Sequence, residues 1–163
     1  NNLVPIVEPE VLIDGNHSIE LCNKVTSKTL KCLFEQLKTL NIYFEGVILK
    51  PSMVISGNKN TKRADYQTVA DMTIQCLKEH LPNNLGGVAF LSGGQTDDES
   101  TNHLNIMNKT NKDFLWRVTF SYARAIQQSA LKIWLGEDAN LAASQQVLSE
   151  RAKLCSKASV GML

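Results

Sequence analysis

Four apolar segments recur along this chain, each followed by a segment with helical periodicity, and this alternation constrains the fold more than any other feature. The apolar segments cover residues 3–8, 42–50, 87–91 and 117–121. They show little strict alternation between apolar and polar side chains, so we expect strands buried on both faces, as in a parallel sheet covered by helices. The pattern therefore predicts an α/β fold.

Helical spacing of apolar side chains marks the segments between and after these strands. Helices are expected over residues 19–40, 66–81, 96–106 and 125–134. A capping-box pattern, Thr96-Asp97-Asp98-Glu99, opens the third helix, and Gly136 ends the fourth. A last amphipathic helix follows, with an apolar side formed by Leu141, Leu148 and Ala152. The order is thus four βα units and one extra helix.

The composition favours one globular domain and gives no sign of a nucleic-acid or membrane partner. The chain has 163 residues, 43% of them apolar, and a formal net charge of +1. That charge provides no bulk attraction to nucleic acid or to a membrane, and no apolar stretch approaches the roughly 20 residues that span a bilayer. We therefore expect residues 1–163 to belong to one domain without either partner.

The cysteines and histidines predict neither disulfides nor a metal centre. Cys22, Cys76 and Cys155 fall within helical patterns beside apolar residues, and no cysteine pair has C-x-x-C spacing. These positions are typical of small core residues in a reducing compartment, so we expect a cytoplasmic protein. The three histidines lie far apart in the sequence. Unless distant ligands converge in the fold, we expect no metal and no cofactor.

Lys50 closes the second apolar segment, in the run Val47-Ile48-Leu49-Lys50-Pro51. An ammonium group held against apolar walls loses hydration, which makes its neutral amine more accessible. A neutral amine can attack a ketone and form a Schiff base. The alternative is a lysine that extends along the apolar surface to water, and for a lysine considered alone this alternative is the better one. The residues expected beside Lys50 favour the reactive interpretation.

Two carboxylates follow the first apolar segment, Glu8 and Glu10 in Pro5-Ile6-Val7-Glu8-Pro9-Glu10. On extended backbone, residues i and i+2 point to the same side, so both carboxylates can share one site. Two carboxylates in one site do not both ionise readily, and one with a raised pKa can transfer protons near neutral pH. The other would orient the amine of Lys50. The alternative is a pair of solvated glutamates at a strand end. Pro9 weakens this alternative, because it stiffens the turn and holds both carboxylates in place.

The last two strands end in residues suited to binding an anion. Ser92-Gly93-Gly94 follows the third strand, and adjacent glycines let the backbone present N–H groups to an anion. Ser121 and Arg124 follow the fourth strand, where the arginine can make a bidentate contact to the same anion. The alternatives are a plain glycine turn and an arginine paired with a surface acid.

All of these positions lie at or just beyond the carboxyl end of a predicted strand. That edge is where βα-barrels and open α/β sheets place their sites. Four units do not close an eight-stranded barrel, which usually needs about 250 residues. The sequence leaves three arrangements open: a half barrel completed by other units, an open doubly wound sheet, and a self-assembled pair of halves.

Taken together, these segments resemble class I fructose-bisphosphate aldolase. The resemblance is carried by residues 3–10, 45–51, 90–95 and 120–125, and it extends to about Ala152. It implies a (β/α)8 TIM barrel, of which residues 1–163 form the second, carboxyl-terminal half. It also implies a glycolytic lyase that cleaves fructose 1,6-bisphosphate reversibly to dihydroxyacetone phosphate and glyceraldehyde 3-phosphate. The resemblance further implies a cytoplasmic homotetramer that uses no cofactor.

The same resemblance implies a role for each candidate residue. Lys50 would be the Schiff-base lysine, Glu8 the proton-transferring carboxylate, and Glu10 the group that holds Lys50 in place. The 1-phosphate of the sugar would be bound by Ser92, Gly93, Gly94, Ser121 and Arg124.

Several features of the chain depart from the family pattern. Ala123 stands where the family usually has glycine. The strand-one aspartate and the lysines of strands three and four, which take part in C–C cleavage, have no counterpart here, nor has the terminal tyrosine. Two alternatives therefore stay open. One is a non-catalytic half that serves as an interaction module. The other is a different Schiff-base phosphosugar barrel enzyme, such as a transaldolase-like protein, although the joint match of motifs argues against it.

Overall fold

The computed structural model describes residues 2–111 and 113–163, which form an α/β fold. Four strands alternate with four helices: β1 (Ile6–Val7), α1 (Ile19–Thr39), β2 (Ile48–Leu49), α2 (Tyr66–His80), β3 (Gly87–Phe90), α3 (Asp97–Thr110), β4 (Val118–Phe120) and α4 (Arg124–Trp134). A fifth helix, α5 (Leu141–Ala158), follows. None of the helices in the described ranges combines the length and hydropathy needed to cross a bilayer.

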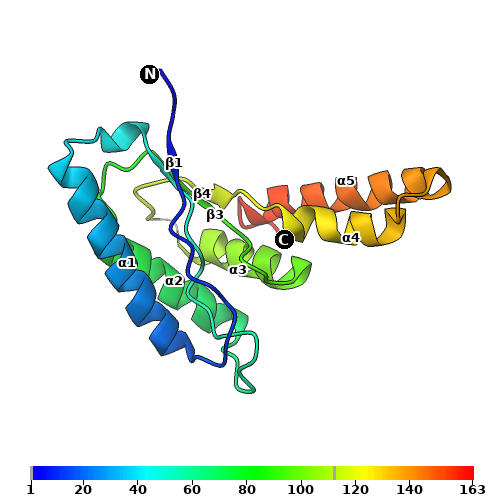
Figure 1. Cartoon of the computed structure of the whole chain (residues 1–163), viewed down its shortest axis with the longest axis horizontal. Coiled ribbons are helices and arrows are strands. Elements are labelled where there is room, and N and C mark those ends of the chain that lie inside the picture. Colours follow the sequence, from blue (N-terminus) through cyan, green and yellow to red (C-terminus); the bar gives the residue numbers. More distant parts are fainter. Residues whose placement is uncertain (1, 112) are drawn as a thin grey trace.

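The four strands form one parallel sheet whose spatial order is the order of the chain, β1-β2-β3-β4. Crossovers between parallel strands are right-handed in almost all proteins. Successive right-handed crossovers in a sequential sheet place every connecting helix on the same face, whereas a doubly wound sheet reverses direction and covers both faces. Figure 1 shows α1, α2 and α3 following one another along the sheet, with α4 and α5 extending from its end as a hairpin. The chain is therefore wound as part of a barrel, and the doubly wound alternative is wrong.

Only one face of the sheet is covered by helices. The register places Val7, Leu49, Val88 and Val118 in one row across the four strands. Leu49, Val88 and Val118 are buried in this row, while on the other face Ile6 is 57% exposed and Thr119 is also exposed. The expectation of burial on both faces is therefore wrong for this chain. The continuous apolar character reflects a second face that has apolar side chains but carries no helix.

The second strand is much shorter than the apolar run that predicted it. Residues Phe44–Gly46 form a short 3-10 helix, and Ile42 and Tyr43 are exposed. The carbonyl of Phe44 accepts hydrogen bonds from the backbone N–H groups of Val47 and Gly86. Periodicity cannot separate a strand from a short apolar turn, which is why the run from residue 42 read as one element.

The helix starts follow the sequence signals closely. Thr96 and Glu99 form the predicted capping box: the Thr96 hydroxyl accepts from the Glu99 N–H, and the Glu99 carboxylate accepts from the Thr96 N–H. Helix α4 differs, because its N-cap residue is Ala123, which offers no side-chain cap. Its end matches the prediction, with Leu135 and Gly136 both in the left-handed region.

Helix α5 buries a face that the sequence pattern did not predict. Leu141 and Leu148, expected on the apolar side, are 46% and 39% exposed, and Ala152 is also exposed. The buried residues are Arg151, Cys155 and Ala158. The expected face was wrong because a buried guanidinium on α5 binds polar groups of α3 and α4, and hydrophobic periodicity carries no signal of such contacts.

Candidate active site

The side chains of Lys50 and Glu8 meet at the carboxyl ends of β2 and β1. Each follows directly after the row of residues that faces the helices, so each points to the opposite, uncovered face of the sheet. The Lys50 Nζ lies 3.0 Å from the Glu8 Oε1, and the two side chains are 21% and 46% exposed. The backbone N–H of Lys50 donates to the carbonyl of Val7 at 2.7 Å, which fixes the lysine in the frame of the sheet.

Glu10 lies further along the same segment and is exposed. It takes part in no ion pair recorded among residues 2–111 and 113–163, so the pair with Lys50 belongs to Glu8 in this structure. The segment is held by Ser52, whose hydroxyl accepts from the Val11 N–H at 2.8 Å and lies 3.2 Å from the Val11 carbonyl. Sequence reasoning missed Ser52. Its only signal was a hydroxyl two residues after the candidate lysine.

The Ser92-Gly93-Gly94 loop leaves the carboxyl end of β3 in a conformation that requires glycine. Gly93 and Gly94 have φ angles of +55° and +83°, and a Cβ on Gly93 would lie 2.8 Å from the Leu91 Cδ1. The carbonyl of Ser92 accepts from the Gln95 N–H at 3.0 Å, which closes the turn. A turn built on adjacent glycines can present its backbone N–H groups to an anion.

Arg124 lies against this loop at the first position of α4. A Cβ on Gly94 would be 3.6 Å from the Arg124 Nη1. Because α4 has no side-chain cap, its first N–H groups have no acceptor from a capping residue, and such helix starts attract anions. The Ser121 N–H donates to the Phe90 carbonyl at 2.8 Å, which keeps the end of β4 beside the loop.

The alanine at position 123 fits its place without strain. Its φ and ψ angles are −100° and −73°. This φ lies outside the left-handed region that favours glycine, so the backbone at this position does not require one.

The candidate residues thus form an ion pair, Lys50 with Glu8, and a second neighbouring pair, Arg124 with Gly94, and all four follow adjacent strands of one sheet. Glu8 and Lys50 directly follow β1 and β2, Gly94 lies in the loop after β3, and Arg124 begins α4 after β4. The Leu91 N–H donates to the Pro51 carbonyl at 3.1 Å, so the residues after β2 and β3 leave the sheet as neighbours. An amine paired with a carboxylate next to an anion cradle suits imine chemistry on a phosphorylated ketone.

A buried histidine anchors the far end of the glycine loop. The His103 Nδ1 lies 2.7 Å from the Gln95 Oε1, and the His103 ring packs edge-on against Tyr66. Burial lowers the pKa of His103 to about 4, which keeps the ring neutral with its Nδ1–H donating to Gln95. No role for His103 was predicted from the sequence, where it lies far from the other two histidines.

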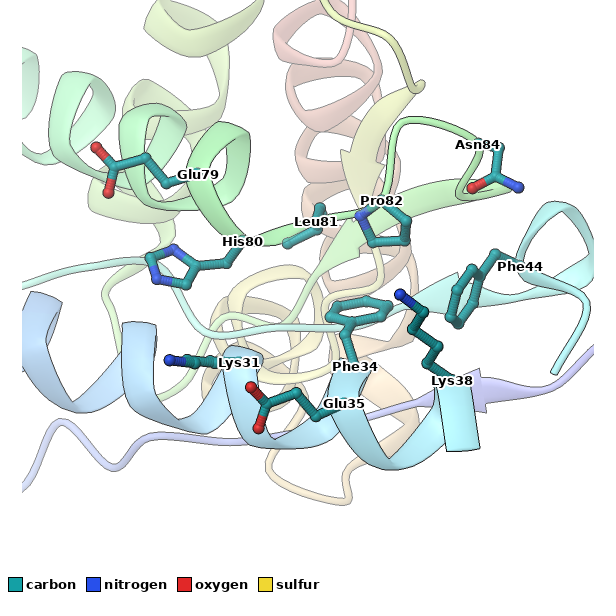
Figure 2. Close-up of a pocket in the computed structure, with 10 residues that line it drawn as sticks. All are labelled: Lys31, Phe34, Glu35, Lys38, Phe44, Glu79, His80, Leu81, Pro82 and Asn84. Atoms are coloured by element: carbon teal, nitrogen blue, oxygen red, sulfur yellow. The ribbon is translucent and has the colours of Figure 1, made fainter. Parts of the chain in front are cut away.

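A cavity of about 740 Å³ lies away from these residues. It is lined by α1, the end of α2 and Phe44, on the helical side of the sheet (Figure 2). None of the candidate site residues lines it. Within the described residues, no three histidine, cysteine or acidic side chains converge as a metal site would require.

Comparison with known proteins gives one family. Its sequence model, fructose-bisphosphate aldolase class-I, matches residues 1–163. A probable fructose-bisphosphate aldolase class 1 of Xanthomonas axonopodis pv. citri is 50% identical over 160 residues, which cover 98% of this chain and 48% of the relative. Fructose-bisphosphate aldolase B of Sparus aurata is 45% identical over 161 residues, covering 99% of this chain and 44% of the relative.

A solved structure agrees with the sequence relatives. The fructose-bisphosphate aldolase of Plasmodium falciparum, crystallised with TRAP and a small-molecule inhibitor, superposes with a TM-score of 0.94 at 44% identity, covering 99% of this chain and 46% of that chain. This chain spans about half the length of the relatives that it matches. The predicted resemblance and the predicted fold class are both confirmed.

Proposed function

We propose, because this chain belongs to the class I fructose-bisphosphate aldolase family, that the protein cleaves fructose 1,6-bisphosphate reversibly through a Schiff base on Lys50. The products are dihydroxyacetone phosphate and glyceraldehyde 3-phosphate. The observation that carries the proposal is the 3.0 Å contact between the Lys50 Nζ and the Glu8 Oε1 on the uncovered face of the sheet. No other lysine of the described residues forms a recorded ion pair with a carboxylate.

Glu8 is the proposed carrier of protons during imine formation. In the ion pair, the amine must lose a proton before it can attack, and the Glu8 carboxylate is in position to accept it. The neutral amine then adds to the C2 ketone and forms a carbinolamine. Glu8 returns the proton to the departing hydroxyl, water leaves, and the iminium ion forms. Its partial exposure lets Glu8 reach both the amine and the substrate oxygen.

Cleavage follows from the positive charge on the iminium nitrogen. A general base accepts the proton of the C4 hydroxyl, the C3–C4 bond breaks, and its electrons flow into the iminium to give an enamine. Glyceraldehyde 3-phosphate leaves first. The enamine is then protonated at C3, and water hydrolyses the resulting iminium to release dihydroxyacetone phosphate and regenerate Lys50.

The 1-phosphate is proposed to bind Ser92, Gly93, Gly94, Ser121 and Arg124. The left-handed glycines, the uncapped start of α4 and the guanidinium beside Gly94 support this assignment. Holding the phosphate fixes the ketone near Lys50, and such orientation can contribute several kcal/mol to the reaction. For Glu10 we propose a secondary role as an acceptor for the Lys50 ammonium, which its exposed side chain can reach by changing rotamer.

The proposed activity is tested by measuring both triose phosphates formed from fructose 1,6-bisphosphate. The complete barrel, with residues 1–163 as its second half, should form them in equal amounts, and Lys50→Arg should abolish the reaction because a guanidinium does not form the imine. Lys59→Arg changes an exposed lysine nine residues later and is the matched control, which should keep full activity. Equal cleavage by Lys50→Arg would contradict the proposal.

At the level of the whole protein, we propose that residues 1–163 form the carboxyl-terminal half of one (β/α)8 domain in a cytoplasmic homotetramer. The coverage of about half of each relative supports the domain assignment. The four free cysteines suit a reducing compartment. Light scattering coupled to size-exclusion chromatography tests the tetramer, and a stable monomer at micromolar concentration would contradict it.

A further inference from the structure

The two parts of the proposed phosphate site belong to different elements that leave the sheet separately. Gly93 and Gly94 lead into α3, and Arg124 begins α4. The β3–β4 ladder ends at Phe90 and Phe120, before either part begins. The backbone pairing of the sheet therefore does not by itself hold the guanidinium of Arg124 against Gly94.

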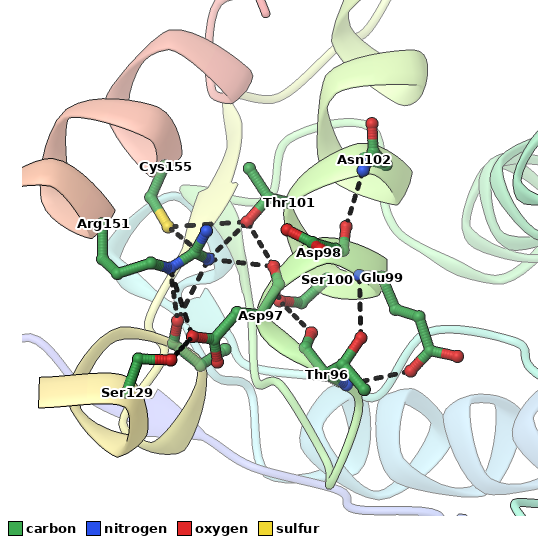
Figure 3. Close-up of polar contacts among 11 residues, drawn as sticks. Thr96, Asp97, Asp98, Glu99, Ser100, Thr101, Asn102, Ser129, Arg151 and Cys155 are labelled. Carbon is green, nitrogen blue, oxygen red and sulfur yellow. Dashed lines mark hydrogen bonds and ion pairs between the residues drawn. The ribbon is translucent and has the colours of Figure 1, made fainter. Parts of the chain in front are cut away.

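Arg151 of α5 connects the first turns of these two helices. The side chain is buried, with 7% of the residue exposed. Its Nη2 donates to the Asp97 carbonyl at 2.9 Å and to the Thr101 Oγ1 at 2.7 Å, both in α3. Its Nε and Nη2 donate to the Ala125 carbonyl in α4 at 3.2 and 3.1 Å. Figure 3 shows the guanidinium between the two helix starts.

The side chain of Asp97 in α3 also contacts both Arg151 of α5 and Ser129 of α4. Its Oδ2 lies 3.5 Å from the Arg151 Nε and accepts a hydrogen bond from the Ser129 hydroxyl of α4. The planar guanidinium thus hydrogen-bonds two carbonyls and a hydroxyl while it forms an ion pair with a carboxylate. A lysine ammonium offers a point charge without this fixed fork. The contact needs an arginine rather than a positive charge alone.

We propose that Arg151 is a positioning residue for phosphate binding, which holds Arg124 at the distance from the Gly93–Gly94 loop that an anion requires. The inference rests on the phosphate site of the proposed function. Among residues 2–111 and 113–163, the hydrogen bonds and the ion pair of Arg151 go to residues outside the candidate site. It acts through Asp97, three residues after Gly94, and through Ala125, the residue after Arg124.

The test measures phosphate affinity in variants of Arg151 and in a control variant of another arginine that contacts α3. Arg151→Met should weaken the binding of inorganic phosphate by at least about tenfold, as measured by calorimetry. Arg151→Lys should restore little of the affinity, because it restores charge without the fork. The matched control is Arg63→Met, which removes the exposed partner of Glu99 in the same first turn of α3 and should change phosphate affinity less than about twofold.

A second readout separates positioning from structural loss. Borohydride trapping at Lys50 should fall in Arg151→Met for dihydroxyacetone phosphate but stay unchanged for dihydroxyacetone, which lacks the phosphate. If Arg151→Met does not fold, Asp97→Asn weakens the same connection and should shift phosphate affinity in the same direction. Equal phosphate affinity in folded Arg151 variants, or an equal fall for both ketones, would overturn the inference.

The failure of this inference can be told apart from the failure of the proposed function. If neither ketone is trapped at Lys50 in the parent protein, the imine mechanism is wrong, yet loss of phosphate affinity in Arg151→Met would still support the positioning role. If the parent protein binds no phosphate, the positioning role is wrong whatever happens at Lys50.

Discussion

At the scale of single residues, the chemistry rests on Lys50, Glu8 and the glycine loop. The sequence predicted that Lys50 would have a carboxylate neighbour, because both follow strands that a parallel sheet brings together. The residues alone left open whether Glu8 or Glu10 would orient the amine, since that depends on how the chain turns at Pro9, and the resemblance implied Glu10. The structure pairs Lys50 with Glu8 and leaves Glu10 exposed.

Replacing Glu8 by glutamine should slow imine formation without unfolding the protein. The amide keeps the shape of the side chain but cannot accept the Lys50 proton, and general acid–base groups typically contribute 10²–10⁴-fold, so we expect a loss of about that size. The rate of borohydride trapping by dihydroxyacetone phosphate measures it. Glu45→Gln changes an exposed carboxylate that bonds Asn84 and is the control. An unchanged trapping rate in Glu8→Gln would refute the proton-transfer role.

Gly94→Ala should weaken phosphate binding as well as stability. Gly94 has a φ of +83°, and an added Cβ would lie 3.2 Å from the Ile13 Cγ2 and 3.6 Å from the Arg124 Nη1. Left-handed backbone costs an alanine roughly 1–2 kcal/mol. Gly136→Ala is the matched control, because its φ is +80° with nothing within 4 Å of an added Cβ. Both variants should lose similar stability in urea unfolding, and only Gly94→Ala should lose phosphate affinity.

At the scale of elements, the sequence predicted those helix ends that are determined by residues adjacent in the chain. The capping box at Thr96 and the end of α4 near Gly136 depend on residues adjacent in sequence, and both were predicted. The buried face of α5 was not, because the partners of Arg151 lie in α3 and α4. A polar contact between distant helices has no periodicity that a sequence can reveal.

The buried His103 of α3, which bonds Gln95 at the end of the glycine loop, should make the stability of the fold depend on pH. His103 has its pKa lowered from 6.5 to about 4 by burial, so between these values the unfolded state binds a proton that the folded state does not. Stability should therefore fall as the pH drops from 6.5 toward 4, by up to about 3 kcal/mol. Urea unfolding across this range measures the slope. His103→Gln should flatten it, and an unchanged slope would show that another group is responsible.

At the scale of the whole molecule, the order of the strands decides between part of a barrel and an open doubly wound sheet. The sequence predicted four βα units but could not exclude a doubly wound sheet, because strand order is not encoded in the periodicity of any one element. The sequential parallel sheet leaves one face without helices, and Lys50 and Glu8 lie on that face. In a barrel this face points to the interior, where the mouth at the carboxyl ends of the strands holds the site.

The most direct test of this account is to map the adduct left after borohydride reduction with dihydroxyacetone phosphate. Mass spectrometry of the digested parent protein should place the reduced triose phosphate on Lys50 and on no other lysine, and Lys50→Arg should carry none. An adduct confined to other lysines, or well-folded protein that forms none, would contradict the claim that Lys50 is the imine-forming residue.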